Sequence, residues 1–274
     1  MDYYKDKIAI VTGGGSGIGR ALCMELGGSG AKVVVADINA EGAEHTAKAV
    51  TAAGGWARAI RLDVTKAEDV QKLINDTAAE HGRLDFMFNN AGIAYVGETR
   101  DIDLDQWHRI LDVNLNGEIY GSIAAYKQMI KQGFGHIVNT ASVAGLFPAP
   151  TETAYVTTKH GVVGLSISLR LEGAGLGVKV SVVCPGFIRT ELFDTAQVIN
   201  IDRQQALAII PKSMIANVSK VAKVILSGVE RNKAIIVFPF LYKLLWWIYR
   251  LSPSLFESFS YKIVSDFRKL RKDN

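Results

Sequence analysis

The stretch that decides the fold is Lys7–Thr12 (KIAIVT) followed by Gly13–Gly19 (GGGSGIG). The first part predicts a short, fully apolar buried strand, and an amphipathic helix opens near Ile18. A strand, a glycine turn and a helix N-terminus together form a site for a pyrophosphate, because backbone N–H groups point at the anion and no Cβ blocks its approach. The spacing is Gly-x-x-x-Gly-x-Gly, not the commoner Gly-x-Gly-x-x-Gly. The predicted phosphate-binding residues are Gly13, Ser16, Gly17, Ile18 and Gly19.

A second motif, Tyr155-Val156-Thr157-Thr158-Lys159, lies far downstream. One helical turn separates Tyr155 from Lys159, so the phenol and the ammonium share a helix face. A phenol titrates near ~10 in water, and a cation beside it draws its pKa down towards neutrality, where it can exchange a proton with a substrate. Alone the motif is a weak signal, because this spacing occurs by chance on many helices.

The two motifs together are informative. TGGGSGIG joined to a downstream Tyr-x-x-x-Lys resembles the short-chain dehydrogenase/reductase family. The resemblance implies a doubly wound Rossmann fold with a seven-stranded parallel sheet. It also implies hydride transfer with a nicotinamide cofactor.

The rest of the chain alternates apolar strands with helices. Strands are expected at 7–12, 32–37, 56–63, 84–90, 135–142, 178–185 and 234–238. Helices are expected at about 40–53, 66–81, 104–131, 155–175 and 218–230. Such alternation predicts right-handed βαβ units and a parallel α/β sheet with helices on both faces. We expect a catalytic domain over 1–240 and a helical extension over 241–274.

Composition excludes several function classes. The 274 residues are 49% hydrophobic and 21% charged, as in a globular protein. Cys23 and Cys184 lack metal-ligand spacing, so two buried reduced thiols and no metal are expected. The first strand begins after six residues, which leaves no room for a signal peptide and indicates a cytoplasmic protein. Residues 241–274 carry seven basic and three acidic residues, which accounts for the net charge of +4 and gives the body no nucleic-acid signature.

Asp37, at the end of the second strand, indicates the cofactor. A carboxylate there accepts hydrogen bonds from a ribose 2′-hydroxyl and repels a 2′-phosphate, which favours NAD over NADP. Ser16 agrees, since NADP-preferring relatives often carry a basic residue near the turn. Arg20 follows the turn and is expected to point at solvent. Alternatively, Asp37 is a helix cap before Asn39.

The resemblance assigns further cofactor contacts. Asp63 would contact the adenine and Val64 would cover its ring, while the segment from Asn90 through Ala91 to Gly92 matches a family motif beside the cofactor. Pro185, Gly186, Ile188 and Thr190 match PG-x-x-x-T, in which the glycine allows close approach of the nicotinamide and the threonine reaches its carboxamide.

The resemblance also assigns a catalytic tetrad. Tyr155 would be the general acid/base, and Lys159 would lower its pKa and bind the nicotinamide ribose. Ser142 would orient the substrate oxygen. Asn114 would kink its helix and hold a water of the proton relay; its neighbour Asn116 is the competing candidate.

The substrate is expected to be lipophilic. The variable substrate loop would span 187–217, and a lid is also the physical expectation for an insertion after a strand's carboxyl end. Residues expected to line the pocket are mostly apolar, although most pockets are. They are Gly92–Tyr95, Val143–Phe147, Phe187 and Leu192. We therefore expect an NAD-dependent oxidoreductase that interconverts an alcohol and a ketone or aldehyde on a steroid, retinoid or fatty alcohol. The alternative is a cofactor-binding regulatory or scaffolding protein on the same fold.

A homodimer or homotetramer is expected by resemblance, through the Tyr155 helix and the long helix before it. Gly161, Gly164 and Ser168 would form a small-residue stripe for close packing, although the stripe could instead face the sheet.

The tail predicts two amphipathic helices separated by Ser252-Pro253, an N-cap and first helical position. One apolar face would hold Leu241, Leu244, Leu245, Ile248 and Leu251, with Lys243 and Arg250 beside Tyr242 and Tyr249 on another. The second helix would align an apolar face made of Leu255, Phe256, Phe259, Ile263, Phe267 and Leu270, with Lys262, Arg268 and Lys269 outside that face. Aromatic-rich basic helices suit an anionic membrane surface, which would place the protein peripherally on the inner face of a membrane. Packing on a neighbouring subunit or over the substrate pocket is the equal alternative.

Overall fold

The computed structural model describes residues 2–208 and 216–271. Its strands are β1 (Ile8–Thr12), β2 (Lys32–Asp37), β3 (Trp56–Arg61), β4 (Phe86–Asn89), β5 (Tyr95–Val96), β6 (Gly135–Thr140), β7 (Val178–Pro185), β8 (Ile188–Arg189), β9 (Gln197–Val198), β10 (Ala216–Asn217) and β11 (Ile235–Phe238). Its helices are α1 (Gly17–Gly28), α2 (Ala40–Ala52), α3 (Ala67–His81), α4 (Leu104–Leu111), α5 (Gly117–Gln132), α6 (Thr153–Glu172), α7 (Glu191–Thr195), α8 (Arg203–Ala208), α9 (Val218–Glu230), α10 (Phe240–Leu251) and α11 (Pro253–Lys269).

Seven strands form one parallel sheet in the order β11-β7-β6-β4-β1-β2-β3. The predicted seven-stranded Rossmann sheet is confirmed, and observed strand ends differ from expectation by a few residues only. The strand order reverses between β1 and β4, so the loops after these two strands diverge there. In doubly wound sheets such a switch point is where ligands bind.

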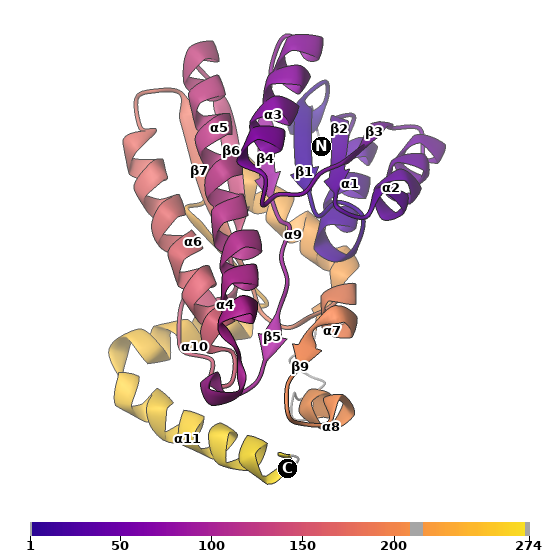
Figure 1. Ribbon diagram of the computed structural model, residues 1–274. Helices are drawn as coiled ribbons and strands as arrows, with labels where there is room; N and C mark the ends of the chain where they lie inside the picture. The colour runs from indigo at the N-terminus through magenta and orange to yellow at the C-terminus, as the bar shows by residue number, and fades with distance from the viewer. Residues whose placement is uncertain (1, 209–215, 272–274) are drawn as a thin grey trace.

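Helices cover both faces of the sheet (Figure 1). Helices α1, α2 and α9 pack over one face, in a core that includes Val11, Leu22 and Ile225. Helices α3 and α5 pack over the other, in a core that includes Ile10, Ile74 and Met129. The central strand β1 is buried along its whole length, as its unbroken apolar run predicts.

The long helix expected from 104 to 131 is interrupted. Helix α4 passes through a π-helical segment, Asp112–Asn116, before α5 begins at Gly117. The π-turn coincides with Asn114, whose side chain bonds the backbone of another loop and not its own helix. A π-turn of this kind often marks a functional site.

The segment 187–217 carries more regular structure than expected. It contains β8, α7, β9 and α8, with β10 at its end, and these elements follow directly on the carboxyl end of β7. Strand β9 pairs with β5, and β10 pairs with β8. Pro211, noted in the sequence, lies outside the described residues.

The tail forms the two expected helices, which lie at the end of the molecule that also holds β5 and α7 (Figure 1). Proline 253 stands at the first position of α11, as predicted. The far end of α11 is fastened to the body: Arg268 Nε donates to Glu98 Oε1 at 2.8 Å, and Arg271 Nη2 donates to Asp101 Oδ1 at 2.8 Å. Over the described part of the chain, we find no helix with the length and apolar character needed to cross a membrane.

The faces of the tail helices differ from expectation. Tyr242 is buried, and Leu245, Trp246 and Tyr249 pack beside it against the body. Of the leucine face that was expected, Leu241, Leu244 and Leu251 are exposed, whereas Leu245 packs inward. In α11, Phe256 and Phe267 lie inward, Leu255 is exposed, and Arg268 is an ion-pair partner of the body.

Candidate active site

The glycine turn after β1 has the conformation its sequence predicts. Gly13 and Gly17 have φ of 64° and 50°, a region that L side chains rarely adopt. At Gly19 a Cβ would lie 2.0 Å from the carbonyl oxygen of Gly13, so close packing of helix on turn excludes any side chain there. The turn therefore leaves backbone N–H groups at the N-terminus of α1.

An anionic group already occupies that N-terminus. The Gly17 N–H donates to Glu191 Oε2 at 2.9 Å, and Thr190 lies against the same glycine. The Glu191 carboxylate stands in for a phosphate, which shows that this turn accepts negative charge. The predicted residue Thr190 is thus brought to the glycine turn.

Asp37 lies beside the turn, as predicted. Its Oδ2 accepts from the Gly15 N–H at 2.9 Å and its Oδ1 from the Asn39 N–H at 2.9 Å. The N-cap of α2 is Asn39 and not Asp37, so the cap alternative is wrong. The expectation for Arg20 is also wrong: Arg20 Nε donates to the Gly15 carbonyl at 3.1 Å, because the start of α1 directs the guanidinium back over the turn.

The loop after β4 is locked to the glycine turn. Thr12 Oγ1 accepts from the backbone N–H groups of Asn90 at 2.9 Å and Ala91 at 3.2 Å. The Asn90 side chain donates in return to the Thr12 carbonyl at 3.0 Å. Gly92 follows, with Asn114 and Lys159 as the nearest neighbours of the position a Cβ would take.

Asp63 and Val64 follow β3. The Asp63 carboxylate accepts from the Thr65 N–H at 3.0 Å and from its hydroxyl at 2.8 Å. Burial opposes ionisation of Asp63, but these Thr65 hydrogen bonds hold its pKa below its usual value. Val64 is buried and meets Gly117 at the start of α5.

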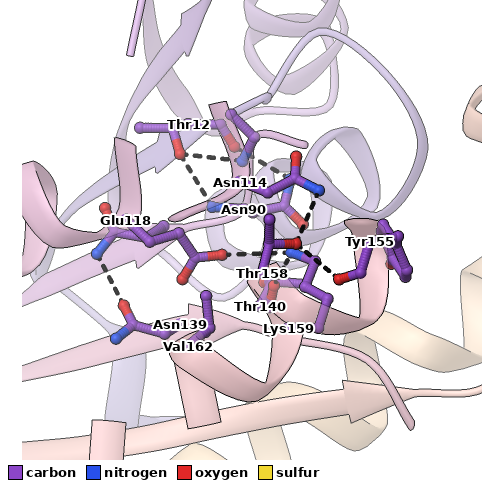
Figure 2. A network of polar contacts seen from close by, with 12 residues as sticks. Thr12, Asn90, Asn114, Glu118, Asn139, Thr140, Tyr155, Thr158, Lys159 and Val162 are labelled. Atoms are coloured by element: carbon purple, nitrogen blue, oxygen red, sulfur yellow. Dashed lines mark hydrogen bonds and ion pairs between the residues drawn. The ribbon is translucent and has the colours of Figure 1, made fainter. Parts of the chain in front are cut away.

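Asn114 is fully buried and clamps the loop that follows Gly92 (Figure 2). Its Oδ1 accepts from the Ile93 N–H at 2.8 Å, and its Nδ2 donates to the Ile93 carbonyl at 2.9 Å. The rival Asn116 bonds only Asp112 at the surface. The choice of Asn114 over Asn116 therefore agrees with the structure.

Tyr155, Lys159 and Ser142 come together at the carboxyl ends of β6 and β7. The Lys159 Nζ donates to the Thr140 carbonyl at 2.7 Å and lies 5.7 Å from the centre of the Tyr155 ring. Ser142 caps the turn after β6 and donates from Oγ to the Pro185 carbonyl at 3.4 Å, and its hydroxyl acts on the Tyr155 phenol in the direction that lowers the pKa. The four predicted residues, which come from three separate stretches of sequence, lie in one cluster.

The charge balance around Tyr155 differs from expectation. Burial raises the pKa of the Tyr155 phenol, and Glu152 and Glu118 raise it further. Burial lowers the pKa of Lys159, and Glu118 opposes that shift. The predicted lowering of the Tyr155 pKa by Lys159 is not met, because burial of the phenol raises its pKa most and the charges of Glu152 and Glu118 act in the same direction.

Glu118 and Glu152 are the site residues that the sequence analysis missed. Glu118 Oε1 lies 3.6 Å from Lys159 Nζ (Figure 2). Burial raises the pKa of Glu118 to about 8 and that of Glu152 to about 7. The one available signal for Glu152 was its position one turn before Tyr155. Glu118 reads as an ordinary acid in the middle of the helix expected over 104–131.

The PG-x-x-x-T segment is only partly as expected. Pro185 ends β7, and Ile188 is buried in β8. A Cβ on Gly186 would lie 2.1 Å from Cε2 of Tyr242 in α10, so the ring of Tyr242 packs directly against this glycine, a contact that the sequence did not predict. Phe256 of α11 also packs on Phe147 at 5.1 Å between ring centroids. The tail therefore covers residues that were expected to line the substrate pocket.

Comparison with known proteins agrees with this geometry. The short chain dehydrogenase family matches residues 7–198. Cyclohexanol dehydrogenase of Acinetobacter sp. (strain SE19) is 37% identical over 202 residues, which cover 72% of this chain and 80% of the relative. D-threitol dehydrogenase of Mycolicibacterium smegmatis is 39% identical over 186 residues, covering 68% and 72%.

A solved structure extends the comparison to nearly the whole chain. A short chain dehydrogenase/reductase from Burkholderia phymatum in complex with NAD superimposes with a TM-score of 0.84 at 28% identity, covering 93% of this chain and 96% of that one. Sheet order, glycine turn, clustered tetrad and sequence relatives agree, and we conclude that the chain belongs to the short-chain dehydrogenase family of oxidoreductases.

Proposed function

We propose that this oxidoreductase is an NAD-dependent alcohol dehydrogenase for lipophilic alcohols. The observation that carries the proposal is the single cluster of Ser142, Tyr155, Lys159 and Asn114 beside the switch point of the sheet. Two relatives are named as dehydrogenases of alcohols, one cyclic and one a polyol.

The residues present fit a dinucleotide. The α1 N-terminus holds the Glu191 carboxylate, so it accepts an anion of the kind that a pyrophosphate presents. The Asp37 carboxylate next to Gly15 supports NAD, because it would accept from a ribose 2′-hydroxyl and repel a 2′-phosphate. NAD is the cofactor named in the Burkholderia phymatum structure. When bound, a nicotinamide supplies the hydride acceptor or donor.

The chain's own residues account for the proton chemistry. Tyr155 exchanges the proton of the substrate hydroxyl, and the Ser142 hydroxyl holds the substrate oxygen next to it. Lys159 is held by its hydrogen bond to the Thr140 carbonyl, and its ammonium lies beside the Tyr155 ring and helps to position it. Asn114 binds the Ile93 backbone through two hydrogen bonds and thereby fixes the loop that follows Gly92.

An apolar substrate is supported by what surrounds this cluster. Val143 and Phe147 are buried beside it, and Phe187 with Phe256 adds aromatic surface. The test is a screen of cyclohexanol, hydroxysteroids, retinol and long-chain alcohols with NAD and with NADP, with D-threitol as the polar control. Turnover of lipophilic alcohols with NAD is expected. A preference for D-threitol would overturn the substrate class, and tight NAD binding without turnover of any alcohol would favour a regulatory protein.

We also propose a homo-oligomer. Gly164 and Ser168 are exposed on α6 and leave room for a second helix, whereas Gly161 meets Leu115 of its own chain. Light scattering that reports a monomer at micromolar concentration would remove this proposal.

A further inference from the structure

Glu118 is a buried acid beside the proposed catalytic lysine. Its side chain is 2% exposed, and it projects from the first turn of α5, immediately after the π-helical segment (Figure 2). Oε1 lies 3.6 Å from Lys159 Nζ, and neither carboxylate oxygen has a hydrogen-bond partner among the described residues.

Such a placement is costly. An ionised carboxylate loses several kcal/mol of hydration on burial, and one ion-pair contact without hydrogen bonds does not restore it. Lys159 offers the only cation close to Glu118 among the described residues, and its short bond goes to the Thr140 carbonyl. Glu118 and Lys159 therefore titrate as a coupled pair and not as independent groups.

The other titratable groups that face this pair are few. Tyr155 comes from α6 and Cys184 from β7, while Glu152, the N-cap residue of α6, acts on the Tyr155 phenol. Burial raises the pKa of Cys184, so its thiol is neutral at physiological pH. The net charge near Tyr155 therefore depends on Glu118, Lys159 and Glu152. The negative charge of Glu118 acts on Tyr155 in the direction that keeps the phenol protonated.

We propose that Glu118 is a positioning residue that holds Lys159 in place and whose own charge, acting on the Tyr155 phenol, sets the pH at which Tyr155 becomes active. The proposal rests on the proposed function, in which Tyr155 exchanges a proton with the substrate. It goes beyond the tetrad because it adds a fifth, buried group behind the lysine.

The test compares wild type with Glu118→Gln, which keeps the side-chain shape and removes the charge. Removing the charge lowers the pKa of the phenol, so the acid limb of the pH profile of kcat/KM for alcohol oxidation should move to lower pH by about one unit. Glu172→Gln, at the exposed end of α6, is the matched control and should leave the profile unchanged. An unshifted limb in Glu118→Gln, or a shift to higher pH, would overturn the proposal.

A second readout does not depend on activity. Carboxyl ¹³C NMR of glutamate-labelled protein should show a resonance that titrates near pH 8 and disappears in Glu118→Gln. A Glu118 carboxyl that titrates at the ordinary value would contradict the coupling even in a protein without turnover. Failure to oxidise any alcohol while this resonance is present would count against the proposed function alone.

A separate observation concerns the outer face of the tail, which we define as Phe240, Leu241, Leu244, Trp247, Leu251 and Leu255. These side chains are exposed, Phe240 by 76% and Leu251 by 81%, and they lie on two consecutive helices that pack on each other. A contiguous apolar surface of this kind on a folded protein indicates a binding face.

Its charge indicates the partner. No acidic residue occurs from Phe240 to Phe256, while Lys243 is exposed and the Arg250 guanidinium lies 5.4 Å from the Trp246 ring and 5.7 Å from that of Trp247. Tryptophan beside a basic side chain suits the boundary between acyl chains and anionic headgroups. The basic residues Arg268 and Arg271 are not part of this face, because they bind Glu98 and Asp101.

We infer that the outer face of the tail lies on an anionic lipid surface. The inner side of the same two helices packs on residues that were expected to line the substrate pocket. The outer face of the tail and the proposed site therefore lie on opposite sides of the same pair of helices. The occupant is a lipid surface and not a second copy of the chain, because the face pairs apolar side chains with cations and offers no acidic partner for them.

Vesicle sedimentation tests this inference with the full chain. Binding is expected to vesicles that contain phosphatidylserine, to be weaker to pure phosphatidylcholine, and to fall at least tenfold in the double variant Leu244→Ser/Leu251→Ser. Leu171→Ser removes an equally exposed leucine at the end of α6 and should leave binding unchanged. Equal binding of wild type and the double variant would overturn the inference. So would a change of oligomeric state in the double variant without vesicle binding by wild type, since the face would then join two copies.

Discussion

The ring of Tyr242 occupies the space into which a side chain on Gly186 would project, with Cε2 2.1 Å from the position of a Cβ. The two residues are far apart in the sequence, and one belongs to a motif of the body while the other belongs to the tail. The tyrosine hydroxyl also lies 3.5 Å from the Phe187 N–H. This contact joins the tail to the body at the proposed site.

Gly186→Ala should therefore displace the tail. Overpacking of a filled contact costs about 1–3 kcal/mol, and this loss should appear as a lower free energy of unfolding in urea. The double variant Gly186→Ala/Tyr242→Ala should lose less than the sum of the two single variants, because the clash is gone. Additive losses would mean that the ring and the glycine do not interact.

Tyr155→Phe should abolish turnover and keep NAD affinity within a few-fold. The change removes only the transferable proton and leaves the ring in place. Calorimetry with NAD gives the affinity, and Lys159→Ala is the informative comparison, since it should damage both turnover and binding. Retained turnover in Tyr155→Phe would mean that another group serves as the acid.

Asp37→Ala should narrow the preference for NAD over NADP by on the order of 1–3 kcal/mol, the scale of one lost buried hydrogen-bonded partner. The measurement is kcat/KM with each cofactor. A wild-type enzyme that prefers NADP would remove the argument from Asp37 altogether.

Glu191→Gln should strengthen NAD binding by about twofold to fivefold. Its carboxylate competes for the Gly17 N–H, and a charge at a helix N-terminus contributes about 0.3–1 kcal/mol. Glu68→Gln, in the first turn of α3, is the control and should not change the Kd. A weaker Kd in Glu191→Gln would show that Glu191 does not compete with the cofactor.

His136 should make the protein sensitive to acid. Burial lowers the pKa of its imidazole to about 3, while the unfolded chain protonates it near ~6.5. The contribution of His136 is thus complete above about pH 6.5 and is lost as the pH falls towards 3, by about 5 kcal/mol in all.

His136→Asn isolates this contribution. The variant should be less stable at neutral pH, because Ser181 loses its partner at 2.9 Å, but its stability should fall less steeply below pH 6.5. His45→Asn, at an exposed position of α2, should keep the wild-type slope. Parallel slopes in wild type and His136→Asn would contradict the assignment.

The fold was predictable because its signals are local. The apolar strands, the glycine turn and the alternation of elements each lie within one window of sequence, and the structure confirms the sheet they imply. Asn114 could be chosen over Asn116 from the register of its motif.

The rest depends on packing between distant segments. From the sequence, Glu118 is an acid in the middle of the helix expected over 104–131, and only the packing of α5 against α6 places it beside Lys159. The grouping of side chains on α10 was partly wrong for the same reason, since Leu245 packs inward beside Tyr242 and not with the exposed leucines. The leucine row of α10 is the more apolar, yet Tyr242 packs inward because Gly186 leaves a space of matching shape.

The tail is attached to the body by two kinds of contact. The first is apolar packing around Tyr242, which salt does not weaken. The second point of attachment is the set of ion pairs that Arg268 and Arg271 form with Glu98 and Asp101, much of it near the surface. Mobile ions screen charges near the surface, so rising ionic strength should loosen only the second point. The far end of α11 should therefore be held less firmly at high salt, while the apolar contacts of Tyr242 and Phe256 keep the rest of the tail on the body.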